Sequence, residues 1–162
     1  MSSGGEVDWL RRAVELCSRS AAAYKAAFML TPISRLERHL LDRCTERYAL
    51  LEHLLGFLLE HGMAAEGMRA MLERLDTDPA RHARFENALA EACSYDRELV
   101  RLIDRALSGG LRLPAALGEC LAAKRRDLEA HGQGHGGAMR VEETVEHPLP
   151  LTALPVGAAT PC

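Results

Sequence analysis

The chain has 162 residues and a formal net charge of −3, and 48% of its residues are hydrophobic. This length supports one domain with a real core, and the apolar content excludes a chain that is disordered throughout. The absence of a basic excess argues against nucleic acid or an anionic membrane as the partner. Aromatic residues make up 4%, while Leu, Ala, Glu and Arg dominate. That mixture favours helices over strands.

The N-terminal residues MSSGG lack the charged and then apolar pattern of a signal peptide. No apolar run approaches the roughly 20 residues that a membrane-spanning helix needs. The five cysteines form no CxxC or CxxH pair, so they carry no zinc signature. Their odd number and wide spacing argue against a secreted disulfide framework. We therefore expect a cytoplasmic protein.

Apolar residues recur in alternating steps of three and four along four stretches, which is typical of helices that share a buried seam. The first helix is expected over about residues 6–29 and the second over about 32–61. Thr31-Pro32 supplies an N-cap and a first-turn proline for the second helix, and Gly62 supplies its C-terminal stop.

A short amphipathic helix is expected within residues 63–75. Asp78-Pro79 then predicts the start of the third long helix, and Gly109-Gly110 its end. Pro114 opens the fourth, which the following glycines end near His131.

The sequence thus predicts an all-α, antiparallel four-helix bundle over residues 1–131, with a short connecting helix between the second and third long helices. Residues 132–162 are rich in glycine and proline and predict a flexible tail. The apolar segment 149–157 of that tail is read either as a docking peptide or as an unselected extension.

Three charged residues fall in the apolar seams, where a charge needs a partner: Arg47, Asp96 and Lys124. In a structural interpretation, Arg47 and Asp96 form a buried ion pair that fixes the register of the helices. The flanking charges of Glu15, Lys124 and Asp127 would then reach toward water.

In the alternative interpretation, acidic residues from the four helices form a metal site for iron or manganese. The candidate ligands are Glu15, Glu46, Asp96, Asp127 and His131. Di-iron sites of the ferritin-like kind use a Glu-x-x-His motif on two helices, because residues three apart share a helix face. The chain contains no Glu-x-x-His, and Arg47 places a cation at the level of the expected metal.

Helices one and two also carry a pattern known from one family. The run from Glu15 contains Tyr24 followed closely by Ala26-Ala27, and the second helix has Arg47 at its middle and a leucine-rich stretch that ends in Gly62. These features resemble a bacterial ferritin-like family of unknown function. In that family the third helix has an acidic motif, to which Asp96 lies close, and the fourth ends near a histidine, as here at His131.

The resemblance covers roughly residues 9–131. It implies a four-helix bundle with ferritin-like topology, and no established activity. From the residues themselves we expect a non-enzymatic protein that forms a homo-oligomer or binds a protein partner, because the leucines of residues 50–59 cover more than one face of their helix. The alternatives are a metal-binding redox or stress protein and an adaptor tethered by its tail.

Overall fold

The computed structural model describes residues 3–75, 82–111 and 113–138. Every regular element in these ranges is helical, which confirms the predicted all-α class. The elements are α1 (Ser3–Leu30), α2 (Ser34–Glu60), α3 (Ala65–Glu73), α4 (Phe85–Arg105), a π-helical turn (Ala106–Gly110) and α5 (Ala115–Ala138). None of the described helices is both long enough and apolar enough to cross a membrane.

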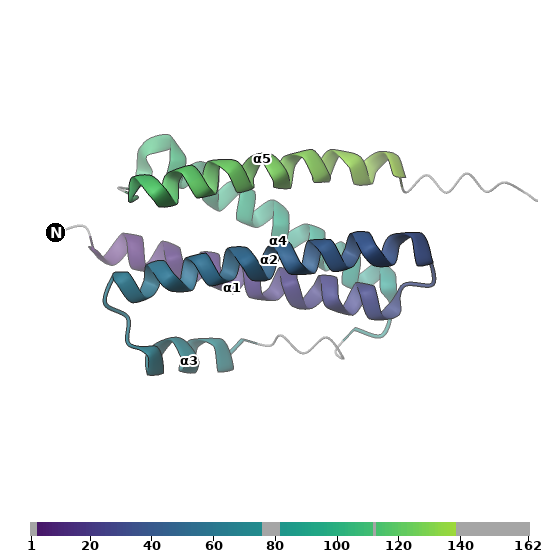
Figure 1. The fold of residues 1–162 in the computed structure, drawn as a ribbon, viewed down its shortest axis with the longest axis horizontal. Helices are drawn as coiled ribbons and strands as arrows, with labels where there is room; N and C mark the ends of the chain where they lie inside the picture. The colour runs from purple at the N-terminus through teal and green to yellow at the C-terminus, as the bar shows by residue number, and fades with distance from the viewer. Residues whose placement is uncertain (1–2, 76–81, 112, 139–162) are drawn as a thin grey trace, which may run out of the picture.

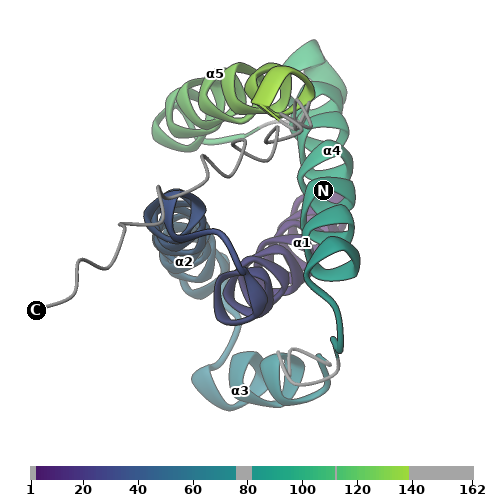
Figure 2. The same cartoon turned by 90° about the vertical axis from the view of Figure 1, so that its right-hand side faces the viewer.

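Helix α1 holds the fold together, because it packs along α2 and also along α4. α2 runs antiparallel to α1, and the chain then returns along the bundle through α3, so that α4 runs in the same direction as α2 (Figure 1). α5 packs against α4 and runs antiparallel to it. The end view in Figure 2 places α3 and α5 at opposite sides of the molecule.

The turn between α1 and α2 differs in detail from the prediction. α2 begins at Ser34, with Ile33 in the N-cap position. The prediction that Thr31 is the N-cap and Pro32 a first-turn residue was therefore wrong. The hydroxyl oxygen of Thr31 instead accepts a hydrogen bond from the backbone N–H of Ile33 at 3.2 Å, within the turn. At the other end Gly62 has a φ of +85°, and the N–H of Met63 reaches the carbonyl of Leu58 at 3.0 Å. This left-handed glycine ends α2 as the sequence predicted.

The glycine after α4 and the proline before α5 lie where the sequence predicted helix ends, but the start of α4 and the end of α5 differ from the prediction. Gly109, at a φ of +93°, ends the helical path after α4, and Pro114 immediately precedes α5. α5 continues to Ala138, past the predicted end near His131. The start of the third long helix was predicted wrongly, because α4 begins at Phe85 with Arg84 in the N-cap position, and residues 82–84 are not helical. The Asp78-Pro79 signal itself and tail residues 139–162 lie outside the described residues.

Among the residues that the structure describes, the buried apolar side chains form two clusters at different heights along the helices. One joins α1, α2, α4 and α5 around residues such as Leu10, Leu54 and Leu121. The other joins α1, α2 and α4 around residues such as Tyr24 and Leu89. Because most α1 residues in the second cluster are alanines, the neighbouring helices can approach α1 closely.

Candidate functional site

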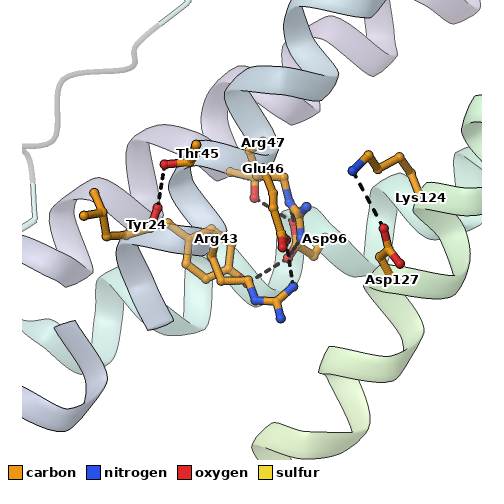
Figure 3. Close-up of polar contacts among 10 residues, drawn as sticks. Tyr24, Arg43, Thr45, Glu46, Arg47, Asp96, Lys124 and Asp127 are labelled. Atoms are coloured by element: carbon orange, nitrogen blue, oxygen red, sulfur yellow. Dashed lines mark hydrogen bonds and ion pairs between the residues drawn. The ribbon is translucent and has the colours of Figure 1, made fainter. Parts of the chain in front are cut away.

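The carboxylate of Asp96 on α4 is the centre of a buried polar cluster between the two apolar clusters. Arg47 of α2 donates from Nε to Oδ1 and from Nη2 to Oδ2, both at 2.8 Å (Figure 3). From α1, Ser20 donates its hydroxyl to Oδ1 and Tyr24 donates its hydroxyl to Oδ2, both at 2.7 Å. Ser20, Tyr24, Arg47 and Asp96 are called the polar cluster below.

Local sequence places these groups where they meet. Ser20 and Tyr24 are four residues apart, so they share one face of α1. Arg47 occupies a position of the buried stripe of α2, and its side chain is 2% exposed. The side chain of Asp96 is 15% exposed. The three helices are therefore tied together at one level by hydrogen bonds rather than by apolar packing.

The electrostatics favour the ionised pair. Burial by itself would raise the pKa of Asp96. The hydrogen bonds and positive charge of Arg47, together with the hydrogen bonds from Ser20 and Tyr24, outweigh this effect and hold the pKa below its ordinary value. Burial lowers the pKa of Arg47, and Asp96 more than reverses this. The Arg47 guanidinium carbon also lies 5.8 Å from the centre of the Tyr24 ring, within cation–π range.

Burial raises the pKa of Tyr24, and the neighbouring negative charge of Asp96 raises it further. The phenol therefore stays protonated and keeps donating its hydrogen bond to Asp96. With four donors on two oxygens, the carboxylate has used the acceptor positions that a base or a metal ligand would need.

Cys17 lies on α1, three residues before Ser20 of the polar cluster, and is fully buried. Burial raises the pKa of its thiol to about 12, so the thiolate fraction near pH 8 is about a thousandfold smaller than that of a thiol at the ordinary pKa. We predict that iodoacetamide at pH 8 alkylates Cys17 at least roughly a thousandfold more slowly in the native protein than in urea. Peptide mass spectrometry measures both rates, and comparable rates would contradict this burial.

Arg43 is a second buried arginine, one turn before Arg47 on α2. Its Nη1 lies 3.0 Å from the Glu46 carboxylate, and its buried Nε has no hydrogen-bond partner. Burial lowers the pKa of Arg43, and Glu46 partly offsets this effect. The proposed ligand Glu46 is therefore the counter-ion of a buried arginine.

The other proposed metal ligands lie apart from this position. Glu15 on α1 accepts a hydrogen bond from Nη1 of Arg12 at 2.6 Å and forms an ion pair with Arg19 at 3.0 Å.

On α5, Asp127 lies 3.7 Å from Nζ of Lys124, away from the polar cluster (Figure 3). His131 falls within α5, but its side chain is outside the described set.

The described side chains among the proposed ligands do not fit a di-iron or dimanganese centre. Glu15, Glu46 and Asp96 are each neutralised by arginine, so a cation already occupies the place that a metal charge would take. Among the described side chains, no group of three His, Cys, Asp or Glu residues could hold a metal ion. The structure thus brings Arg47 and Asp96 together, whereas Glu15, Glu46 and Asp127 each pair with a basic residue of their own helix.

No family model, curated protein or solved structure matches this chain. The ferritin-like resemblance stays a prediction from the sequence, and the function has to be argued from the residues themselves.

The surface of α2 carries large apolar side chains in addition to those of its buried face. Its buried leucines are Leu40, Leu50, Leu51, Leu54 and Leu58. Three further large side chains point outward on the same helix: Leu41 is 48% exposed, Tyr48 45% and Leu59 48%. Apolar residues thus continue from the buried face of α2 onto its surface.

Sequence reasoning missed Ser20 and Arg43. The only sign of Ser20 in the sequence was its spacing of four from Tyr24, which places the two residues on the same face of a helix. Arg43 has the same spacing from Arg47. A charge in a seam predicts a partner, but the sequence alone does not say which neighbouring polar side chains join it.

Proposed function

We propose that this protein is a cytoplasmic, non-enzymatic helical module that acts by binding a second copy of itself or another protein. The observation that carries the proposal is the exposure of Leu41, Tyr48 and Leu59 along one helix. Scattered apolar residues are normal on a protein surface, but a row along one element is typical of an interaction site.

The polar cluster supports the non-enzymatic part of the proposal. Both oxygens of Asp96 are saturated by donors, and Arg47 is almost fully enclosed. A general base must reach the proton that it removes, and a ligand must have free lone pairs. The cluster therefore has the properties of a structural pair that fixes helix register.

We also infer that α1, α2, α4 and α5 form a four-helix bundle with ferritin-like topology. The long connection through α3, which lets α4 follow the direction of α2, supports this inference. The shared apolar cluster of all four helices supports it as well.

The test is an association measurement on the purified, tag-free chain, together with a pull-down in which the tagged chain is the bait. We expect concentration-dependent self-association or a retained protein partner, and either should weaken when Leu41 is replaced by aspartate. A chain that stays monomeric and retains no partner would contradict the proposal.

A second readout on the same preparation tests the non-enzymatic part of the proposal. We expect iron and manganese far below one per chain in aerobically purified protein. Stoichiometric iron or manganese would contradict this assignment, because it would require ligands that the described arrangement does not bring together.

A further inference from the structure

The outward residues of α2 form a second heptad seam beside the buried one. Starting from Leu41, steps of four and three residues continue to the end of the helix. The six positions, called the outer seam below, are Leu41, Thr45, Tyr48, Glu52, Leu55 and Leu59. Five of them are exposed and Leu55 is half-buried. A seam with this alternation is the pattern by which one helix packs along another, and it extends over about 27 Å.

The two polar groups at the middle of the outer seam have complementary chemistry. Tyr48 presents a phenolic O–H donor, and Glu52 presents a carboxylate acceptor. Neither side chain has a hydrogen-bond or ion-pair partner among the residues that the structure describes. An interface that covers the seam has to satisfy both groups, because an unpaired carboxylate is costly to bury.

The outer seam is complementary to a second copy of itself that runs in the opposite direction. A second α2, laid antiparallel and centred between Tyr48 and Glu52, places Leu41 against Leu59 of the other copy at each end. Thr45 then meets Leu55 of the other copy, and Tyr48 meets Glu52 of the other copy twice, once on each side of the two-fold axis. Every polar group at the centre is paired, as a self-complementary two-fold interface requires.

A parallel arrangement lacks this complementarity. It would place Glu52 against Glu52 and Tyr48 against Tyr48, so that two carboxylates face each other and the tyrosine hydroxyls lose their acceptor. The charged residues at the ends of the outer seam also favour the antiparallel arrangement, because it brings Arg38 of one copy near Glu60 of the other. The pattern therefore favours a second copy of this chain as the partner, with its α2 antiparallel to the first.

We propose that the outer seam is a homodimer interface, in which α2 of one copy packs antiparallel against α2 of a second copy, with paired Tyr48–Glu52 hydrogen bonds at the centre. This inference rests on the proposed function and names the partner that the function requires. It also specifies the register of the two helices, in which Tyr48 of each copy lies opposite Glu52 of the other.

Sedimentation equilibrium of four proteins tests the interface: the wild type, Leu41→Asp, the double variant Leu41→Asp/Leu59→Lys, and the control Leu107→Asp. Leu107 has a similar exposure, 40%, but lies in the π-helical turn after α4 and outside the seam. Thermal unfolding of each variant verifies the fold, and all substituted positions are exposed in the monomer, so we expect little loss of stability.

We expect the wild type to form a dimer and Leu107→Asp to associate equally well. Leu41→Asp should raise the dissociation constant by at least roughly tenfold, because it places a carboxylate against Leu59. The double variant should recover most of this loss, since antiparallel packing puts each introduced carboxylate beside an introduced ammonium. In a parallel dimer the double variant would pair like charges and associate no better than the single one.

Three results would overturn the inference. A dimer unaffected by Leu41→Asp would place the interface elsewhere, and a double variant without recovery would exclude the antiparallel register. A wild type that stays monomeric at millimolar concentration would exclude the second copy as occupant. The proposed function itself would fail only if, in addition, the tagged chain retained no partner whose capture depends on Leu41.

Discussion

Replacing Arg47 by alanine should lower the free energy of unfolding by about 3 to 5 kcal/mol. The substitution leaves the Asp96 carboxylate in a largely buried position with only the Ser20 and Tyr24 hydroxyls as donors. It also removes a large side chain from the core, which adds the cost of a cavity. Urea unfolding followed by circular dichroism measures the change.

The matched control is Arg12→Ala. Arg12 also bridges two helices, through its ion pair with Glu98, but both side chains are more than 40% exposed. Exposed pairs are worth no more than about 1 kcal/mol, so this variant should remain close to the wild type. Equal losses in the two variants would show that the Arg47–Asp96 pair has no special role in stability.

Asp96→Asn should cost about 3 kcal/mol or more at pH 7, because it keeps the shape of the side chain but leaves Arg47 buried without a counter-ion. The loss should also depend on pH in one direction. The pKa of Asp96 lies below its ordinary value in the folded chain, so its ionisation stabilises the fold above the unfolded pKa of about 4.

This stabilisation is lost as the pH falls from that value toward the folded pKa, where the wild-type carboxyl becomes neutral like the amide. The difference in unfolding free energy between wild type and Asp96→Asn should therefore be largest above about pH 5 and shrink below about pH 4. Unfolding curves at a series of pH values measure it. A difference that stays constant from pH 7 to pH 3 would contradict a depressed pKa.

The parts of this structure that the sequence could predict are those with a periodic or steric signal. The apolar stripes locate the helices, and Gly62 and Gly109 end their helices because both adopt positive φ values. Arg47 and Asp96 could be singled out since a charge inside an apolar stripe needs a partner.

The parts that could not be predicted depend on which side chains meet in three dimensions. The spacing of four places Ser20 on the face of Tyr24, and Arg43 on the face of Arg47, but it does not say which polar side chains meet. Whether an arginine is buried depends on the helices around it. The run of glycines after His131 predicts a helix end, but α5 continues to Ala138. Glycine lowers helix propensity without forbidding a helix.

The outer seam shows a related difficulty. The leucines of α2 predict more than one apolar face, but exposure depends on where the other helices lie. Leu50 and Leu54 are buried in the apolar cluster that α2 shares with α1, α4 and α5, whereas Leu41 and Leu59 remain exposed. The sequence of α2 fits both a helix whose wide apolar face is entirely buried and a helix with a second apolar seam on the surface. Only the packing of the other helices distinguishes the two.

We propose that the polar cluster stabilises the fold, whereas the surface of α2 carries the function. An apolar variant separates the two: Ser20→Ala, Tyr24→Phe, Arg47→Met and Asp96→Leu in one chain. Replacing a complete buried ion pair by apolar residues is often neutral or stabilising, so the variant should fold.

The most direct measurement is the dimer dissociation constant of this apolar variant beside that of the wild type, by sedimentation equilibrium. We predict that the wild type dimerises and that the two constants agree within about threefold, which is less than 1 kcal/mol. A folded apolar variant that no longer associates would contradict the account, because it would show that the polar cluster serves the function and not only the fold.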